Sequence, residues 1–142
     1  MKIRQILRSK GHDVVTINAD RSALDAVMLL VDRNIGGVMI VDAGRPVGIL
    51  TERDILRLTA QSPGELGTVS VGSIMTRTLI TATPEHDLND AMSLMSRHKI
   101  RHLPILDGGR LAGIVSIGDL VNACLTLAEE ENVHLREYIQ GA

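Results

Sequence analysis

The sequence has almost no aromatic residues and almost no cysteine. Phe and Trp are absent, and Tyr138 is the only aromatic side chain among 142 residues. A bound base or ring would therefore have to lie between aliphatic side chains instead of stacking on an aromatic platform. The single cysteine, Cys124, cannot form an internal disulfide, which fits a reducing compartment and predicts a cytoplasmic location.

The sequence also lacks a strong net charge and long apolar runs. The formal net charge is −2, and no basic stripe is present, so we expect neither nucleic acid nor an anionic membrane surface as a partner. No apolar run approaches the roughly 20 residues that span a bilayer, and the residues after Met1 do not resemble a signal peptide. Apolar residues make up 44% and charged residues 23%, which is typical of a soluble globular protein.

An internal repeat is the strongest feature of the sequence. When the chain is aligned with itself at an offset of 65 residues, many positions are identical and most others exchange one aliphatic residue for another. The protein is therefore a tandem duplication. The matching pairs include Thr16 with Thr81, Asp25 with Asp90, Ile40 with Ile105, Gly44 with Gly109, Gly48 with Gly113, and Asp54 with Asp119.

Each repeat is predicted to have the order β-α-β-β-α. Continuous apolar runs indicate strands, Ser22 with Asp25 and Asp87 indicate helix starts, and Gly-containing segments indicate turns. In the first repeat we expect strands at 14–17, 38–41 and 47–50 and helices at 22–33 and 52–59; in the second, strands at 79–81, 103–106 and 111–116 and helices after 87 and from 117. Further helical segments are expected at 3–9, 71–75 and 128–140.

The apolar positions of the helices predict which faces are buried. In the first repeat Leu24, Val27, Met28 and Val31 follow the helical period, and in the second Leu88, Ala91, Met92 and Met95 do so. Apolar strands alternating with amphipathic helices indicate an α/β (α+β) fold. Since neither half could bury its surfaces alone, we expect two repeats packed about a pseudo-twofold axis, with short N-terminal and C-terminal helices. The expected domains are 1–68 (N-terminal segment, first repeat and linker), 69–127 (second repeat) and 128–142 (helical tail).

The same motif closes both repeats. An apolar strand ends on Thr51, or on Ser116, and an Asp follows three residues later at 54 or 119. This spacing is a capping box, so each motif is predicted to turn a strand directly into a helix N-terminus. Unpaired N–H groups there suit a phosphate, and an Asp in the first turn can accept from two ribose hydroxyls. The alternative is a plain helix cap, which is about as plausible as a ligand contact for Asp119.

The two β-α-β-β-α copies with Gly-aliphatic-aliphatic-(Thr/Ser)-x-x-Asp resemble a tandem pair of CBS domains (cystathionine β-synthase domains), also called a Bateman module. Residues 100–105 (Ile-Arg-His-Leu-Pro-Ile) and the hairpin at 107–110 match the same family. The resemblance covers residues 14 to about 126, and the chain closely resembles small stand-alone CBS pairs. It implies a regulatory module that binds an adenosine-containing ligand such as AMP, ADP, ATP, S-adenosylmethionine or NAD(H) between the repeats, with no required cofactor.

The resemblance also implies the residues of a first ligand site. Asp54 would hold the ribose hydroxyls, and Thr51 with the backbone N–H groups of Glu52 and Arg53 would face phosphate. Arg101 and His102 would reach a phosphate from the other repeat, and an Arg side chain offers a planar fork of donors suited to phosphate oxygens. The residues implied to enclose the base are Thr16, Ile17, Val38 and Ile49.

A second site is implied in the other repeat, but it departs from the pattern. Ile117-Gly118 replaces Glu52-Arg53, which removes a cation, and Gly36-Gly37 stands where the second repeat has Arg101-His102. We therefore expect this site to be weaker, empty or suited to less charged ligands. Its implied residues are Thr81, Ala82, Leu103, Ile114, Ser116 and Asp119.

Other classes of function have less support. We find no nucleophile with an adjacent base and no paired carboxylates, so an enzyme is not expected. His98 and His102 are four apart, but a helix end and a strand do not provide helical i, i+4 metal ligation, and no metal is expected. His12, His86 and His134 are expected at the surface. The prediction is a non-catalytic sensor of energy or redox state that regulates an unidentified partner protein and forms a homodimer. The alternative is an interaction or dimerisation module without a ligand.

Overall fold

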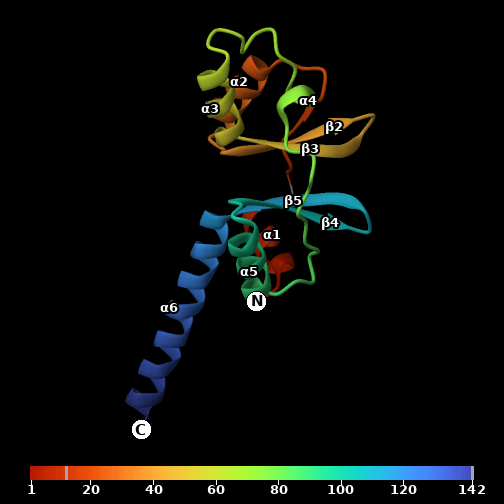
Figure 1. Ribbon diagram of the computed structural model, residues 1–142. Helices are drawn as coiled ribbons and strands as arrows, with labels where there is room; N and C mark the ends of the chain where they lie inside the picture. Colours follow the sequence, from red (N-terminus) through yellow and green to blue (C-terminus); the bar gives the residue numbers. More distant parts are fainter. Residues whose placement is uncertain (12, 142) are drawn as a thin grey trace. The chain divides into compact units, whose positions relative to one another are not determined.

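The computed structural model describes residues 1–11 and 13–141, and they form two compact units (Figure 1). One unit comprises Asp13–Ile80, and the other comprises the described residues of Met1–His12 and Thr81–Ala142. The sequence placed the N-terminal segment beside the first repeat, whereas its contacts group it with the second. The α/β fold with two repeats is confirmed, and the packing of the repeats about a pseudo-twofold axis stays a prediction.

The unit of the first repeat is built on a three-stranded sheet in the order β1-β2-β3. β1 (Thr16–Asn18) runs parallel to β2 (Gly37–Asp42), and β2 pairs antiparallel with β3 (Arg45–Thr51). A two-residue turn joins β2 to β3; positive φ angles at Ala43 and Gly44 give the hairpin geometry that matches strand twist. The predicted hairpin is confirmed, whereas β1 begins two residues later than expected.

Three helices accompany this sheet: α2 (Ala23–Arg33), α3 (Glu52–Gln61) and the single turn α4 (Val71–Ile74) (Figure 1). Ser22 caps α2 by accepting a hydrogen bond from the Asp25 N–H at 3.1 Å, as predicted. Asn34 ends the helix in the left-handed conformation, at the predicted position. The hydrophobic core of the unit consists of Ile17, Ala26, Leu30, Val38, Ile40, Leu50 and Val71.

The predicted buried face of α2 was wrong. Leu24, Met28 and Val31 are 45%, 58% and 74% exposed, whereas the buried residues of α2 are Ala23, Ala26 and Leu30. Both sets follow the helical period, so periodicity alone could not choose between them. The small Ala side chains allow the helix backbone to approach the sheet closely, which leaves the bulkier apolar residues on the outside.

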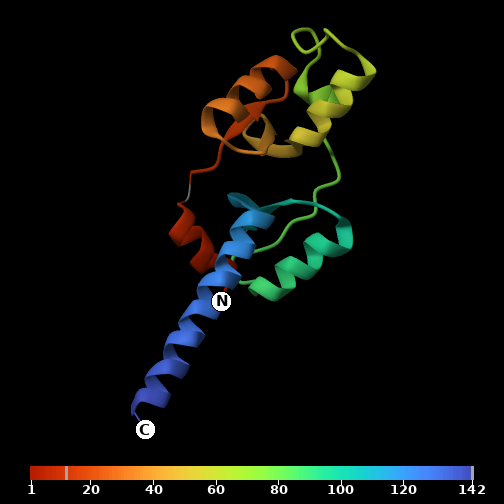
Figure 2. The ribbon, with the colours of Figure 1, turned by 90° about the vertical axis from the view of Figure 1, so that its left-hand side faces the viewer.

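The unit of the second repeat contains a hairpin and three helices. β4 (His102–Asp107) pairs antiparallel with β5 (Arg110–Ser116), and α5 (Leu88–His98), α1 (Ile3–Lys10) and α6 (Ile117–Gly141) pack beside it (Figure 2). The predicted face of α5 is confirmed, because Leu88, Ala91 and Met95 are buried. Buried residues elsewhere in the unit include Ile3, Leu7, Leu103, Ile105, Val115 and Leu120.

The strand expected at 79–81 is not formed. Ala82 alone makes a parallel bridge to Ile105; its N–H donates to the Pro104 carbonyl at 3.1 Å, and its carbonyl accepts from Leu106 at 2.9 Å. The next N–H, of Thr83, donates instead to His86 Nδ1 at 3.0 Å. The turn that follows therefore ends the pairing immediately after Ala82.

α1 is attached to the second repeat by backbone hydrogen bonds. The N–H of Ile3 donates to the His86 carbonyl and that of Arg4 to the Pro84 carbonyl, both at 2.9 Å. Leu7 lies over Gly113, where an added Cβ would come within 2.6 Å of the Leu7 Cδ2 atom. α4 has the same relation to the first repeat, because Met75, directly after α4, contacts Gly48. Each strand-to-helix motif thus has a short helix beside its glycine.

Candidate functional site

Asp54 is a buried carboxylate at the turn from β3 to α3. Asp54 is 7% exposed. Its Oδ2 accepts a hydrogen bond from the Thr51 N–H at 2.9 Å, and the Thr51 hydroxyl lies 3.3 Å from the same oxygen. On the other side Oδ1 lies 3.5 Å from the Thr76 hydroxyl and 3.8 Å from Arg57 Nη1. The expected cap is therefore present. Its contacts to Thr76 and Arg57 are long, so these two groups hold Oδ1 weakly.

Several predicted residues gather at one end of the three-stranded sheet. Gly37 pairs with Thr51, Val38 with Leu50, and Thr16 with Met39 two residues further along β2. The start of β1, the start of β2 and the end of β3 thus lie together, with Asp54 one helical turn beyond. Ile17, Val38 and Ile49 are 9%, 0% and 8% exposed, and the first two belong to the core, so a base here would meet mainly their backbone.

The N-terminus of α3 has fewer open N–H groups than its sequence suggested. The Glu52 N–H donates to the Gly36 carbonyl at 3.0 Å, so it is not available to a phosphate in this structure. The equivalent Ile117 N–H in the second repeat donates to the Arg101 carbonyl at 2.9 Å. Glu52 and Arg53 both have exposed side chains, which leaves the Arg53 guanidinium accessible beside the turn.

Arg101 and His102 precede and begin β4, in the unit of the second repeat, whereas Asp54 belongs to the unit of the first. Arg101 is exposed, and His102 is partly buried and pairs with Ser116 across the hairpin. Their contribution to a site at Asp54 stays a prediction.

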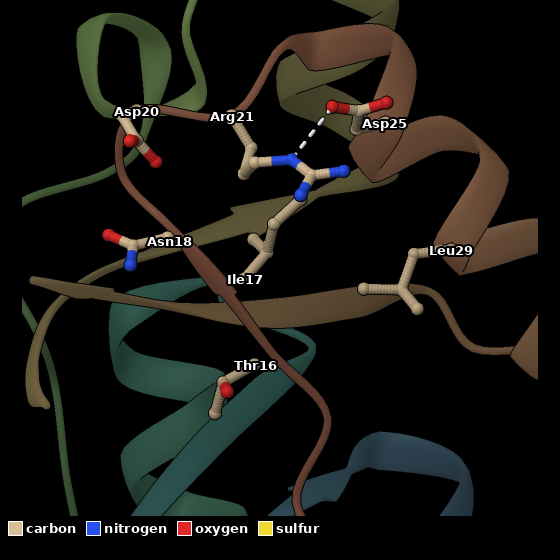
Figure 3. A pocket seen from close by; sticks show the side chains of 7 residues that line it. All are labelled: Thr16, Ile17, Asn18, Asp20, Arg21, Asp25 and Leu29. Atoms are coloured by element: carbon tan, nitrogen blue, oxygen red, sulfur yellow. Dashed lines mark hydrogen bonds and ion pairs between the residues drawn. The ribbon is translucent and has the colours of Figure 1, made fainter.

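A surface pocket beside β1 and α2 was not predicted from the sequence (Figure 3). Its volume is about 490 Å³, and it includes the predicted residues Thr16 and Ile17. Arg21 Nε lies 2.9 Å from Asp25 Oδ2, and this ion pair forms part of the lining. The pair lowers the pKa of Asp25 through the Arg21 hydrogen bond. The other lining residues are Asn18, Asp20 and Leu29.

The turn from β5 to α6 repeats the cap with one addition. Ser116 N–H donates to Asp119 Oδ2 at 2.8 Å, and the Asp119 N–H donates to the Ser116 hydroxyl at 3.1 Å. Lys10, the last residue of α1, donates from Nζ to the same Asp119 oxygen at 2.6 Å and to the Ile114 carbonyl at 2.6 Å. The sequence predicted that this turn has no cation. That prediction was wrong, because Lys10 supplies one from a segment 109 residues earlier in the chain.

The pKa of Asp119 reflects this contact. Partial burial by itself would raise it, but the hydrogen bonds from Lys10 and Ser116 outweigh burial and hold the pKa below its usual value. Asp119 is therefore ionised and paired at neutral pH. Of the other predicted second-site residues, Ala82 and Leu103 are buried at 2% and 0% exposure, and Thr81 and Ile114 are partly buried.

The histidines and the cysteine within the described residues do not gather into a metal site. Among residues 1–11 and 13–141, no group of three or more His, Cys, Asp or Glu could hold a metal ion. His98 ends α5 and His102 begins β4, and His12 lies outside the described residues. Cys124 is partly buried, with its Sγ 3.4 Å from Met92 Sδ. In the part of the chain that the structure describes, no helix is both long and apolar enough to cross a bilayer.

Comparisons with known proteins agree with this architecture. The CBS domain family model matches residues 3–60 and 71–126, so the chain belongs to the CBS domain family and carries the domain twice. It is 36% identical to the mitochondrial CBS domain-containing protein CBSX3 of Arabidopsis thaliana, over 98% of this chain and 72% of that protein. It is also similar to the crystal structure of ATU1752 from Agrobacterium tumefaciens (TM-score 0.84, 36% identity, 87% and 98% of the two chains).

A third similar structure contains ligands. The CBS domain pair of protein MJ0100 was crystallised in complex with 5′-methylthioadenosine and S-adenosyl-L-methionine. It has a TM-score of 0.77 and 30% identity to this chain, and the alignment covers 87% of this chain and 94% of that one. A CBS pair of this degree of similarity thus binds adenosine-containing molecules.

Proposed function

We propose that this protein is a non-catalytic regulatory module that binds an adenosine nucleotide at the Asp54 turn. The observation that carries the proposal is the buried Asp54 carboxylate, whose Oδ1 has only long contacts within the described part of the chain, to Thr76 and Arg57. A buried carboxylate is stabilised when hydrogen-bond donors surround it. A pair of ribose hydroxyls would supply two strong donors in place of these long contacts. The adenosine-containing ligands of the MJ0100 pair support this choice of ligand class.

The phosphate groups of the ligand would lie over the start of α3. The partial positive charge of that helix N-terminus and the exposed Arg53 guanidinium favour an anion there. Arg101 and His102 would add donors from the second repeat. AMP, ADP and ATP fit this arrangement, and NAD(H) and S-adenosylmethionine share the ribose that Asp54 would recognise.

Binding would act as a switch through a partner protein. A ligand that touches both repeats can change their arrangement only by binding one arrangement more tightly than another. Such a module reports on adenylate levels or on the NAD(H) pool, depending on which ligand it prefers. We further propose that the chain works as a homodimer.

A thermal-shift screen with AMP, ADP, ATP, NADH and S-adenosylmethionine tests the proposal. A ligand at one hundred times its dissociation constant should add about 2.7 kcal/mol to the free energy of unfolding. A clear rise in Tm with at least one of the five compounds is expected. No rise with any of them would favour the alternative, an interaction or dimerisation module without a ligand.

The second turn should bind poorly because Lys10 already occupies Asp119. The ammonium donates to Asp119 Oδ2, an oxygen that a ribose would need, and α1 holds Lys10 in place. Replacing Lys10 with Met keeps most of the side-chain length and removes the donor. In Lys10→Met we expect adenosine, which has no phosphate, to bind at two sites per chain instead of one, as measured by isothermal titration calorimetry.

The matched control is Arg8→Met, which removes an exposed cation from the same helix and should leave one adenosine site. Two equal sites in the unmodified protein would contradict the role of Lys10. A single site in Lys10→Met would contradict it as well.

A further inference from the structure

α6 carries an apolar stripe along most of its length, and this stripe lies on the protein surface. Val121, Leu125, Leu135 and Ile139 are 45%, 57%, 54% and 72% exposed, and Ala128 and Asn132 between them are also exposed. Figures 1 and 2 show the C-terminal end of α6 extending away from the rest of its unit. The helix is fixed at its start by Leu120, which is fully buried.

The spacing of the stripe is that of a two-stranded coiled coil. Residues 121, 125, 128, 132, 135 and 139 alternate in steps of four and three, which places 125, 132 and 139 at a positions and 121, 128 and 135 at d positions. Asn132 is the polar residue at a central a position. A single Asn there is a known device for fixing register, because two facing Asn side chains hydrogen-bond to each other across a parallel dimer.

The flanking charges also match a parallel pair. In this register Glu131 occupies a g position and Arg136 the e position five residues later. In a parallel two-stranded coiled coil, the residue at a g position contacts the residue at the next e position of the other helix. Glu131 of each copy would therefore contact Arg136 of the other copy, which gives two equivalent ion pairs in the dimer. Both side chains are exposed within one chain and free of steric cover. An antiparallel pair would instead place the Asn132 amide opposite an apolar d residue.

We propose that residues 121–139 of α6 form a parallel, in-register coiled coil with the same helix of a second copy of this chain. The inference deepens the proposed homodimer and rests on it. Much of the stripe lies beyond the family match, which ends at residue 126, so this contact belongs to the tail and not to the CBS repeats. Because Leu120 anchors α6 in its own unit, less conformational freedom is lost on pairing than for an unfolded tail.

Disulfide trapping tests the register directly. In a Cys124→Ser background, Ala128→Cys places thiols at facing d positions, and mild oxidation should convert most of the protein into a covalent dimer on a non-reducing gel. The control is Glu130→Cys in the same background, an exposed f position on the outer face, which should stay largely monomeric on the gel. Equal crosslinking of the two variants, or none at Ala128→Cys, would overturn the proposal.

A mixed sample separates the two helix orientations. If Ala128→Cys chains crosslink to Asn132→Cys chains better than to themselves, the pair is antiparallel and the proposal is wrong. Sedimentation equilibrium of the unmodified protein distinguishes this failure from a broader one. If the protein is a monomer, the proposed homodimer is wrong. If it is a dimer but Ala128→Cys does not crosslink, only the proposed coiled coil is wrong.

Charge reversal provides an independent readout. Glu131→Lys alone, or Arg136→Glu alone, turns two attractive contacts into repulsive ones and should weaken the dimer roughly tenfold. The double variant restores opposite charges and should return the dissociation constant close to its original value. Additive weakening in the double variant would contradict a contact between these two residues.

Discussion

Asp54→Asn is expected to abolish the rise in Tm that an adenosine nucleotide produces. The amide keeps the shape of the side chain and one carbonyl oxygen, which can still accept from the Thr51 N–H. It no longer offers two acceptor oxygens to two ribose hydroxyls. Hydrogen bonds to a charged group contribute about 1.5–3 kcal/mol each. Because Asp54→Asn removes the charged acceptor from both ribose hydroxyls, it should weaken nucleotide binding by roughly 100-fold or more.

The matched control is Asp119→Asn, the same change at the equivalent turn of the second repeat. It removes the partner of Lys10 and should leave nucleotide binding at the Asp54 turn intact. Both variants lose part of a helix cap, at a cost of about 1 kcal/mol, so their Tm values without ligand should fall similarly. A nucleotide response that survives in Asp54→Asn, or disappears equally in both, would contradict the assignment of the site.

Gly48→Ala should destabilise the protein more than the equivalent substitution Gly113→Ala in the second repeat. An added Cβ at Gly48 would lie 2.8 Å from the Met75 Cγ and 2.9 Å from the Thr76 carbonyl oxygen, and it would also collide with the Met75 sulfur. The backbone cannot retreat easily, because Thr76 exchanges two hydrogen bonds with Ile49 at 2.9 and 3.0 Å. Overpacking against a fixed backbone typically costs about 1–3 kcal/mol, and we expect the upper part of that range.

Two control variants make this comparison specific. At Gly113 the closest atom is the Leu7 Cδ2 at 2.6 Å, the end of a flexible side chain, so Gly113→Ala should cost less, about 1 kcal/mol. At Gly67 an added Cβ meets nothing within 4 Å, and Gly67→Ala should be close to neutral. Urea unfolding measures all three. Equal losses at Gly48 and Gly113 would show that the Thr76 backbone is free to move.

The Gly48 effect also reaches the site. The Thr76 hydroxyl lies 3.5 Å from Asp54 Oδ1, so displacing Thr76 would alter the surroundings of the carboxylate. We therefore expect Gly48→Ala to weaken nucleotide binding in addition to lowering stability.

The features that local sequence determines were predicted well. Both hairpins, the Ser22 cap and the strand-to-helix turns at Thr51 and Ser116 depend on residues a few positions apart. The repeat supplied the hairpins and the turns twice, whereas Asp87 begins α5 without a side-chain capping hydrogen bond. The capping interaction of Asp54 followed from its spacing to Thr51 alone. Its burial did not, because burial depends on the packing of Thr76 and the rest of the unit.

The features that depend on distant contacts could not be predicted. The exposed face of α2 was taken for the buried one because two sets of apolar residues share the helical period. Lys10 was missed because nothing near it in the sequence points to Asp119. The Glu52 N–H was predicted to face phosphate. Its actual acceptor, the Gly36 carbonyl, lies on a different segment, so the local sequence gave no sign of this hydrogen bond. In each case the deciding neighbour comes from elsewhere in the fold.

A crystal structure of the protein with the nucleotide that stabilises it most would test the central claim directly. The account predicts both ribose hydroxyls within hydrogen-bond distance of the Asp54 carboxylate and a phosphate over the start of α3. A nucleotide bound elsewhere, with Asp54 still held only by Thr51, Thr76 and Arg57, would contradict it.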